Sequence, residues 1–269
     1  MARRFQSLMV FPEWLPTPAN RAFLSSIREF DALVAAMIES RRHGGSAGDD
    51  LLSRMMRARD YEDRPMSDQQ LRDEAVTLLL AGNETTAVAL AWTCWLLARH
   101  PEAAAKAAVE AAEILEDRSA GAADLPRLRV CAMAITEAMR LYPPAYVIGR
   151  ETVRVCRIDG YAIPAGATLF MSPWVTHRDP RFYEQADAFV PERWEAGRSE
   201  RLPRFAYFPF GGGPRICIGS RFAMMETTLV LATMLRRFRL VATLDRPIRP
   251  LPLVTLRPQG GVPLAVIAR

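Results

Sequence analysis

The segment Phe208-Pro-Phe-Gly-Gly-Gly-Pro-Arg-Ile-Cys-Ile-Gly219 places a run of glycines just before one cysteine, Cys217, and a helix is predicted over residues 219–237 directly after it. Glycines let a chain turn sharply and approach a flat ligand closely. A helix N-terminus stabilises a nearby anion such as a thiolate. The segment therefore predicts a loop that presents a thiolate to a ligand.

The other three cysteines have different surroundings. Cys94, Cys131 and Cys156 each lie within an apolar helix or strand pattern, so we expect them to be buried free thiols. No two cysteines have CxxC spacing, and so few in a chain of this length do not form a disulfide scaffold. A reducing, cytoplasmic location is therefore expected. The surroundings of Cys217 are those that a haem–thiolate ligand needs.

The composition is that of a folded globular protein. Half of the 269 residues are hydrophobic and 24% are charged, which is enough apolar material for one large domain. The net charge is +5, and Lys106 is the only lysine among the 35 basic residues. Because the arginines are scattered rather than clustered, the sequence does not predict nucleic-acid binding.

The apolar pattern predicts a mainly α fold with minor β structure. Residues 1–142 are predicted to be helical, with helices over residues 20–42, 50–59, 67–99, 100–115 and 125–142. Residues 143–210 change to period two around a turn at Asp159-Gly160, which predicts a small antiparallel sheet followed by coil. The cysteine loop and its helix occupy residues 208–237, and a terminal hairpin around Gly260-Gly261 is predicted for residues 251–267. No linker is evident, so residues 1–269 are expected to form a single domain.

The helix predicted from residue 67 to 99 is long and apolar, as a membrane span would be. Its middle, however, carries Asn83-Glu84-Thr85-Thr86. A charge at the centre of a bilayer costs about 2.5–3.5 kcal/mol. We therefore expect a buried core helix and no transmembrane segment.

Phe210, Gly213, Arg215, Cys217 and Gly219 match the pattern Phe-x-x-Gly-x-Arg-x-Cys-x-Gly, which resembles the haem-binding loop of the cytochrome P450 superfamily. The resemblance implies the cytochrome P450 fold, with a long central helix and a proximal helix after the cysteine loop. It also implies haem b (iron protoporphyrin IX) as the cofactor, with Cys217 as the axial ligand of the iron. Arg215 matches a position that binds a haem propionate, and arginine is the best donor to a carboxylate.

The middle of the long helix carries Ala81-Gly-Asn-Glu-Thr-Thr86, which resembles the family's oxygen-activation segment. By this resemblance, Ala81 and Gly82 leave room for dioxygen above the iron. Thr85 is expected to donate a hydrogen bond there, and Glu84 to relay protons from solvent. Taken alone, the segment is as well explained by a polar kink or π-bulge in a buried helix.

Two further motifs predict a buried charge cluster. Glu137-Ala-Met-Arg140 matches the family's Glu-x-x-Arg signature, and the spacing puts both side chains on one helix face. Pro191-Glu-Arg-Trp194 resembles the later segment whose arginine, here Arg193, joins that pair. A buried charge without a partner costs several kcal/mol, so the three side chains are needed together. Their expected role is structural, in fixing the coil that leads to the cysteine loop.

Two more residues are placed by the resemblance alone. Arg150, in Pro144-Ala-Tyr-Val-Ile-Gly-Arg150, resembles a second propionate-binding arginine. His177, in Thr-His-Arg-Asp-Pro, matches a common family segment and is considered as a further haem contact.

The resemblance implies a monooxygenase that inserts one oxygen atom of O2 into a small apolar substrate. Substrate contacts are expected from residues 78–81, 145–148 and 259–262. Electrons are expected from a separate partner, a ferredoxin or a flavoprotein reductase, because Gly211-Gly-Gly is not the GxGxxG of a dinucleotide site.

A complete family member is considerably longer and has an N-terminal region ahead of the part matched here. The chain is therefore expected to be a truncated, partial cytochrome P450 domain. One alternative is a catalytically inactive remnant that acts as a haem-binding or interaction module. A second is a peroxide-driven haem–thiolate enzyme, against which the Glu84-Thr85 pair argues, because such an enzyme needs no proton relay.

Overall fold

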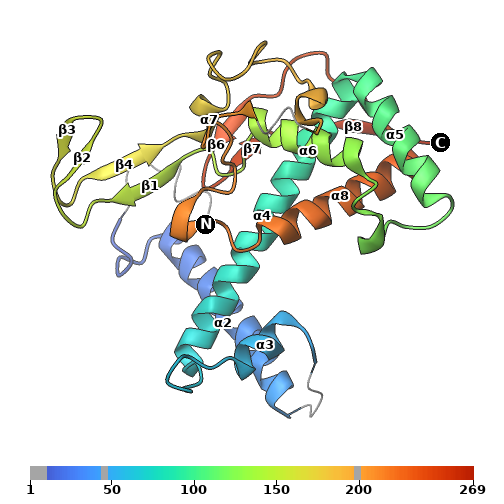
Figure 1. The fold of residues 1–269 in the computed structure, drawn as a ribbon. Coiled ribbons are helices and arrows are strands. Elements are labelled where there is room, and N and C mark those ends of the chain that lie inside the picture. Colours follow the sequence, from blue (N-terminus) through green and yellow to red (C-terminus); the bar gives the residue numbers. More distant parts are fainter. Residues whose placement is uncertain (1–10, 44–47, 197–200) are drawn as a thin grey trace. The chain divides into compact units, whose positions relative to one another are not determined.

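Helix α4 (Asp68–Arg99) runs from the first of two units of the chain, Met1–Asn83, into the second, Glu84–Arg269. The computed structural model describes residues 11–43, 48–196 and 201–269, and Figure 1 shows the elements. The sequence predicted one undivided domain. A boundary inside a continuous helix leaves neither a linker nor a break in periodicity from which it could be predicted.

The first unit is helical. It contains α2 (Pro18–His43), α3 (Leu51–Arg57) and the beginning of α4. The Ser67 hydroxyl accepts a hydrogen bond from the Gln70 N–H (3.1 Å), which confirms the predicted start of α4. A small apolar core holds these helices together through Val34, Ile38 and Leu71.

The core of the second unit lies among four helices. The later half of α4 packs with α5 (Pro101–Leu115), α6 (Arg129–Leu141) and α8 (Ser220–Arg237). A 3-10 turn, η1 (Ala122–Asp124), precedes α6. Every helix predicted from the sequence is present, which confirms the mainly helical fold. The large apolar side chains that are fully buried in this core include Trp92, Leu97, Leu115, Leu128, Ile135, Leu231 and Leu235.

Four short strands form two antiparallel ribbons. β1 (Ile148–Glu151) pairs with β4 (Thr168–Met171), and β2 (Cys156–Ile158) pairs with β3 (Tyr161–Ile163). The turn Asp159-Gly160 has φ angles of 47° and 81°, and two positive angles are the mark of a type I′ hairpin turn. Figure 1 shows the β2–β3 hairpin at the tip of the β1–β4 ribbon. This agrees with the small antiparallel sheet predicted around the Asp159-Gly160 turn.

The remaining strands pair in a way that the sequence did not predict. β5 (Phe238–Ala242) pairs with β8 (Leu264–Ala268), and β6 (Pro250–Pro252) pairs with β7 (Leu256–Pro258). The strands on either side of Gly260-Gly261 therefore do not pair with each other.

The single terminal hairpin predicted over residues 251–267 is thus wrong. Pro258 and Pro263 flank the Gly260-Gly261 turn, and neither has an N–H to donate across it. β8 finds its donors and acceptors on β5 instead, far back in the sequence.

Residues 172–196 and 201–210 are mostly coil. Their regular elements in the described part are α7 (Pro173–Thr176) and the 3-10 helix η2 (Pro191–Trp194). So long a coil inside a domain needs side chains to hold it in place.

Candidate functional site

The Cys217 loop turns at glycines that no other residue replaces without strain. Gly211 and Gly213 have φ angles of +73° and +70°. The Gly211 N–H donates to the Phe208 carbonyl, and the Cys217 N–H donates to the Phe210 carbonyl, both at 2.9 Å. Helix α8 begins at Ser220, so the cysteine lies just before a helix N-terminus, as predicted.

Cys217 is an exposed thiol on this loop. The neighbouring side chains are apolar and also exposed: Ile216 is 56% exposed, Ile218 91% and Phe222 62%. An apolar rim around a single thiol is unusual for a surface that faces only water, and it suits a flat apolar ligand.

The other cysteines are poorer candidates. Cys94 and Cys131 are buried, as predicted, and burial raises the pKa of Cys94 to about 11 and raises the pKa of Cys131 as well. Both are therefore neutral thiols at physiological pH. Cys156 is half-buried, contrary to the prediction, because the two-stranded β2–β3 ribbon covers it on one side only.

The donor set fits a haem. Besides the Cys217 thiol, Arg150 and Arg215 are exposed, and neither forms an ion pair with a carboxylate in the described part of the chain. Among the described residues, the guanidinium of Arg150 donates to the Gly149 carbonyl alone (2.8 Å). One thiol for the iron, two available arginines for propionates and an apolar rim match the three chemical parts of haem b.

Residue 148, at the end of the predicted substrate segment 145–148, lies beside this loop. A Cβ placed on Gly211 would come within 3.6 Å of the Ile148 side chain. The Cys217 loop and the start of β1 are therefore neighbours in the second unit.

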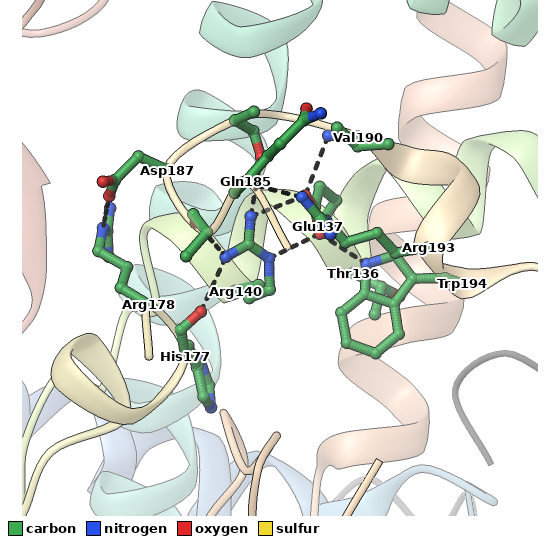
Figure 2. Close-up of polar contacts among 12 residues, drawn as sticks. Thr136, Glu137, Arg140, His177, Arg178, Gln185, Asp187, Val190, Arg193 and Trp194 are labelled. Atoms are coloured by element: carbon green, nitrogen blue, oxygen red, sulfur yellow. Dashed lines mark hydrogen bonds and ion pairs between the residues drawn. The ribbon is translucent and has the colours of Figure 1, made fainter. Parts of the chain in front are cut away.

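A fully buried ion pair lies on α6, as Figure 2 shows. Arg140 donates from Nε and Nη2 to the two carboxylate oxygens of Glu137, at 2.9 and 2.8 Å, and both side chains are 0% exposed. Its remaining N–H groups donate to the carbonyls of His177 (2.8 Å), Ala186 (2.5 Å) and Ala188 (2.8 Å). All five guanidinium donors are satisfied.

The Glu137 carboxylate gathers three further donors from the coil around η2. They are the Arg193 Nε (3.3 Å), the Trp194 indole N–H (2.8 Å) and the Val190 N–H (3.0 Å). The structure therefore brings Glu137, Arg140 and Arg193 together. The Glu137–Arg140 pair thus holds the coil of residues 177–194 against α6. The sequence predicted the three charged side chains, but not the carbonyls and N–H groups of the coil that contact them.

Glu84 has partners that the sequence did not predict. Its carboxylate forms an ion pair with Arg257 on β7, at 2.5 and 2.8 Å, and accepts a hydrogen bond from the Thr255 hydroxyl. The Arg257 guanidinium, with Thr255, holds the pKa of Glu84 below its usual value. Glu84 is therefore ionised at neutral pH. The sequence feature that could have indicated this partner is Arg257, a lone arginine in the otherwise apolar strand β7.

The other residues of the oxygen segment differ in exposure. Gly82 is exposed, and a Cβ built on it would meet no atom within 4 Å. Ala81 is also exposed, whereas Thr85 is half-buried. Ala81 and Gly82 belong to the first unit, and Glu84 and Thr85 to the second.

Strand β7 is held between α4 and the segment before β1. The Trp92 indole N–H donates to the Leu256 carbonyl (2.7 Å), and the Leu256 N–H donates to the Pro144 carbonyl (3.0 Å). The Tyr146 hydroxyl donates to the Leu253 carbonyl (2.9 Å). The Glu84–Arg257 pair thus lies at a junction of three segments.

Replacing Arg257 by leucine is expected to lower the free energy of unfolding at pH 7 by up to about 1 kcal/mol, since the pair is partly exposed. The pKa of Glu84 is lowered in the folded state, so its stabilising effect is present above the unfolded pKa of about 4.3. That effect is lost as pH falls through the folded pKa. Urea unfolding of both proteins at pH 7 and in acid should show the difference shrink in acid. Arg249→Leu, at the exposed arginine before β6, is the control, and an equal difference at both pH values would contradict the account.

His177 is placed differently from the sequence hypothesis. Its side chain is fully buried, so it does not contact a ligand on the exposed face of the Cys217 loop. Its Nε2 instead accepts a hydrogen bond from the Phe208 N–H (2.9 Å).

Helix α4 is long and apolar enough to cross a membrane, judged by length and composition alone. Core helices of soluble proteins meet the same criterion. Its ion-paired Glu84 and the buried Trp92 hydrogen bond lie in the half that belongs to the second unit.

Known proteins match this chain over most of its length. The cytochrome P450 family model matches residues 1–263. The chain is 40% identical to cyclooctatin synthase of Streptomyces melanosporofaciens over 245 residues, which are 90% of this chain and 53% of that protein. It is 36% identical to pentalenene oxygenase of Streptomyces avermitilis over 255 residues, 95% of this chain and 57% of that protein. It is 39% identical to the cyclooctat-9-en-7-ol 5-monooxygenase of S. melanosporofaciens, covering 91% of this chain and 52% of that protein. The chain thus spans about half the length of the curated relatives it matches.

Proposed function

Since the chain belongs to the cytochrome P450 family, we propose that it provides the haem-binding part of a monooxygenase that inserts one atom of O2 into an apolar organic substrate. The observation that carries this proposal is the exposed Cys217 thiol on a glycine loop directly before α8. Haem b ligated by a thiolate supplies dioxygen activation when it is bound. Cys217 is the residue that would hold the iron, and Arg215 and Arg150 those that would hold the propionates.

Glu84 and Thr85 are the residues we assign to proton movement. The Glu84 carboxylate is kept ionised by Arg257, so at neutral pH it acts as a hydrogen-bond acceptor for proton donors that approach from solvent and does not itself hold a proton. The Thr85 hydroxyl, next in the chain, is both donor and acceptor and so passes a proton onward. Gly82 and Ala81 have no side chain or a small one, so they leave space beside this part of α4.

The substrate class follows from the relatives. Their printed names refer to pentalenene and to cyclooctat-9-en-7-ol, which are largely hydrocarbon alkenes by their names. We propose a substrate of this low polarity, contacted in the second unit by residues 145–148 and 259–262. The electron donor is a separate ferredoxin or flavoprotein reductase.

We further propose that the later half of α4 is a core helix and that the protein is soluble and cytoplasmic. Val88, Trp92, Thr93 and Leu97 on this helix are covered by other parts of the second unit. Fractionation of cells that produce the chain tests this assignment: recovery in the soluble fraction is expected, and recovery only with membranes would contradict it.

The proposal is tested by loading the purified chain with haemin and supplying ferredoxin, its reductase, NADPH, pentalenene and 18O2. Saturation at one haem per chain is expected, followed by a product that carries one 18O atom. Product should require the added electron donor. Failure to take up haem, or oxygen that derives from water, would contradict the proposal, and the first result would favour an interaction module without haem.

A further inference from the structure

His177 lies in the coil between the Glu137–Arg140 pair and the Cys217 loop, directly after α7, and it contacts both. Its carbonyl accepts a hydrogen bond from Arg140 Nη1 (2.8 Å), as Figure 2 shows. Its ring Nε2 lies 2.9 Å from the Phe208 N–H, at the first residue of the loop segment. The side chain is 0% exposed, and its ring packs against the rings of Tyr207 (5.0 Å) and Phe208 (5.3 Å, edge-on).

The Phe208 contact fixes the chemical form of the imidazole. A backbone N–H can only donate, so Nε2 must be the acceptor and Nδ1 must carry the ring proton. Burial lowers the pKa of His177 to about 3. A protonated ring would turn a second donor toward Phe208 and break the contact. His177 is thus a neutral acceptor over the physiological pH range.

The Phe208 peptide is in turn the anchor of the cysteine loop. Its carbonyl accepts from the Gly211 N–H, and two residues later the Phe210 carbonyl accepts from the Cys217 N–H, both at 2.9 Å. The first of these hydrogen bonds closes the turn from Phe208 to Gly211, and the second closes the turn that ends at Cys217. A shift of the Phe208 peptide would therefore be passed on to the cysteine.

We infer that His177 is a positioning residue, which sets the register of the Cys217 loop by linking the Phe208 amide to the buried Glu137–Arg140 pair. It touches neither the thiol nor the exposed face of the loop. The consequence for haem ligation rests on the proposed function, whereas the link from His177 to Phe208 does not.

The ring shape and the acceptor atom can be separated by substitution. His177→Phe keeps a flat ring and removes the acceptor. His177→Gln places a side-chain carbonyl oxygen near the position of Nε2, and His177→Asn is too short to reach it. His100→Phe is the control, because His100 is a half-buried histidine of the same unit, with its own hydrogen bond to the Leu96 carbonyl (2.7 Å) and a ring contact to Phe189 (5.0 Å).

The first measurement is amide hydrogen exchange of the full chain, with the Phe208 N–H compared with that of Ile135 in α6. Loss of one hydrogen bond predicts exchange at Phe208 about threefold to tenfold faster in His177→Phe and His177→Asn. His177→Gln and His100→Phe should leave it within about twofold of the parent. Unchanged exchange in His177→Phe would overturn the inference. If that variant does not fold, equal exchange in His177→Gln and His177→Asn would overturn it.

The second measurement uses protein loaded with haemin, reduced and exposed to carbon monoxide. His177→Phe should lose part of the thiolate-type Soret band, and His177→Gln should regain it. A general loss of packing would not produce this recovery, because glutamine restores the acceptor atom and not the ring. If the parent loads haem through Cys217 but the Gln and Asn variants give the same band, the inference fails and the proposed function stands. If the parent takes up no haem, the proposed function fails, and the exchange rates still decide the role of His177.

Discussion

Replacing Arg140 by leucine is expected to lower the free energy of unfolding by about 3–5 kcal/mol, the cost of leaving a buried charge without its partner. Glu137 would lose the two donors that face its carboxylate oxygens, and both side chains are 0% exposed, so water does not replace them. The carbonyls of His177, Ala186 and Ala188 would also lose their donor. Because domains are stable by only about 5–15 kcal/mol, this loss removes a large share of the stability and should raise the unfolded fraction steeply at 37 °C.

Urea unfolding at 25 °C measures this loss. The control is Arg129→Leu, at an exposed arginine on the same helix, which should change stability by no more than about 0.5 kcal/mol. Arg140→Lys should lie between the two, because lysine keeps the charge but has three donors for five acceptors. An Arg140→Leu variant as stable as Arg129→Leu would contradict the importance of the pair.

The sequence predicted those features of the structure that are made by residues close together in the sequence. The Ser67 cap and the Asp159-Gly160 turn act within four residues, so their chemistry was visible in the sequence. The Glu137–Arg140 pair is likewise set by helix geometry. The glycines of the Cys217 loop turn through positive φ angles that other residues avoid, which is why they mark the loop in the sequence.

Contacts between distant residues were not predicted. Arg257 meets Glu84 across 173 residues, and nothing local to either residue identifies the other. The pairing of β8 with β5 was missed for the same reason, since periodicity shows that a strand exists and not which strand it joins. His177 was considered as a haem contact because its segment resembles one common in the family, whereas the structure buries its side chain and gives it the Phe208 N–H as a partner.

Replacing Cys217 by serine is expected to abolish thiolate ligation of haem altogether, the largest functional effect that the account predicts. A serine hydroxyl is not deprotonated at neutral pH and does not donate electron density to iron as a thiolate does. The loop itself should persist, because its hydrogen bonds are made by the backbone, including the Cys217 N–H. Unfolding by urea should therefore be little changed, so a loss of ligation will not reflect a loss of fold.

Cys156→Ser is the matched control for that change. Cys156 is the other cysteine that is not fully buried, and it lies on the β2–β3 ribbon rather than on the glycine loop. Haem binding by this variant should equal that of the parent chain.

The reduced carbon monoxide difference spectrum of the haemin-loaded chain tests the central claim, that Cys217 is the haem thiolate, most directly. The parent and Cys156→Ser should show the thiolate-type Soret band, and Cys217→Ser should show none. A thiolate-type band that survives in Cys217→Ser, or that is absent from a parent chain which has taken up haem, would contradict the account.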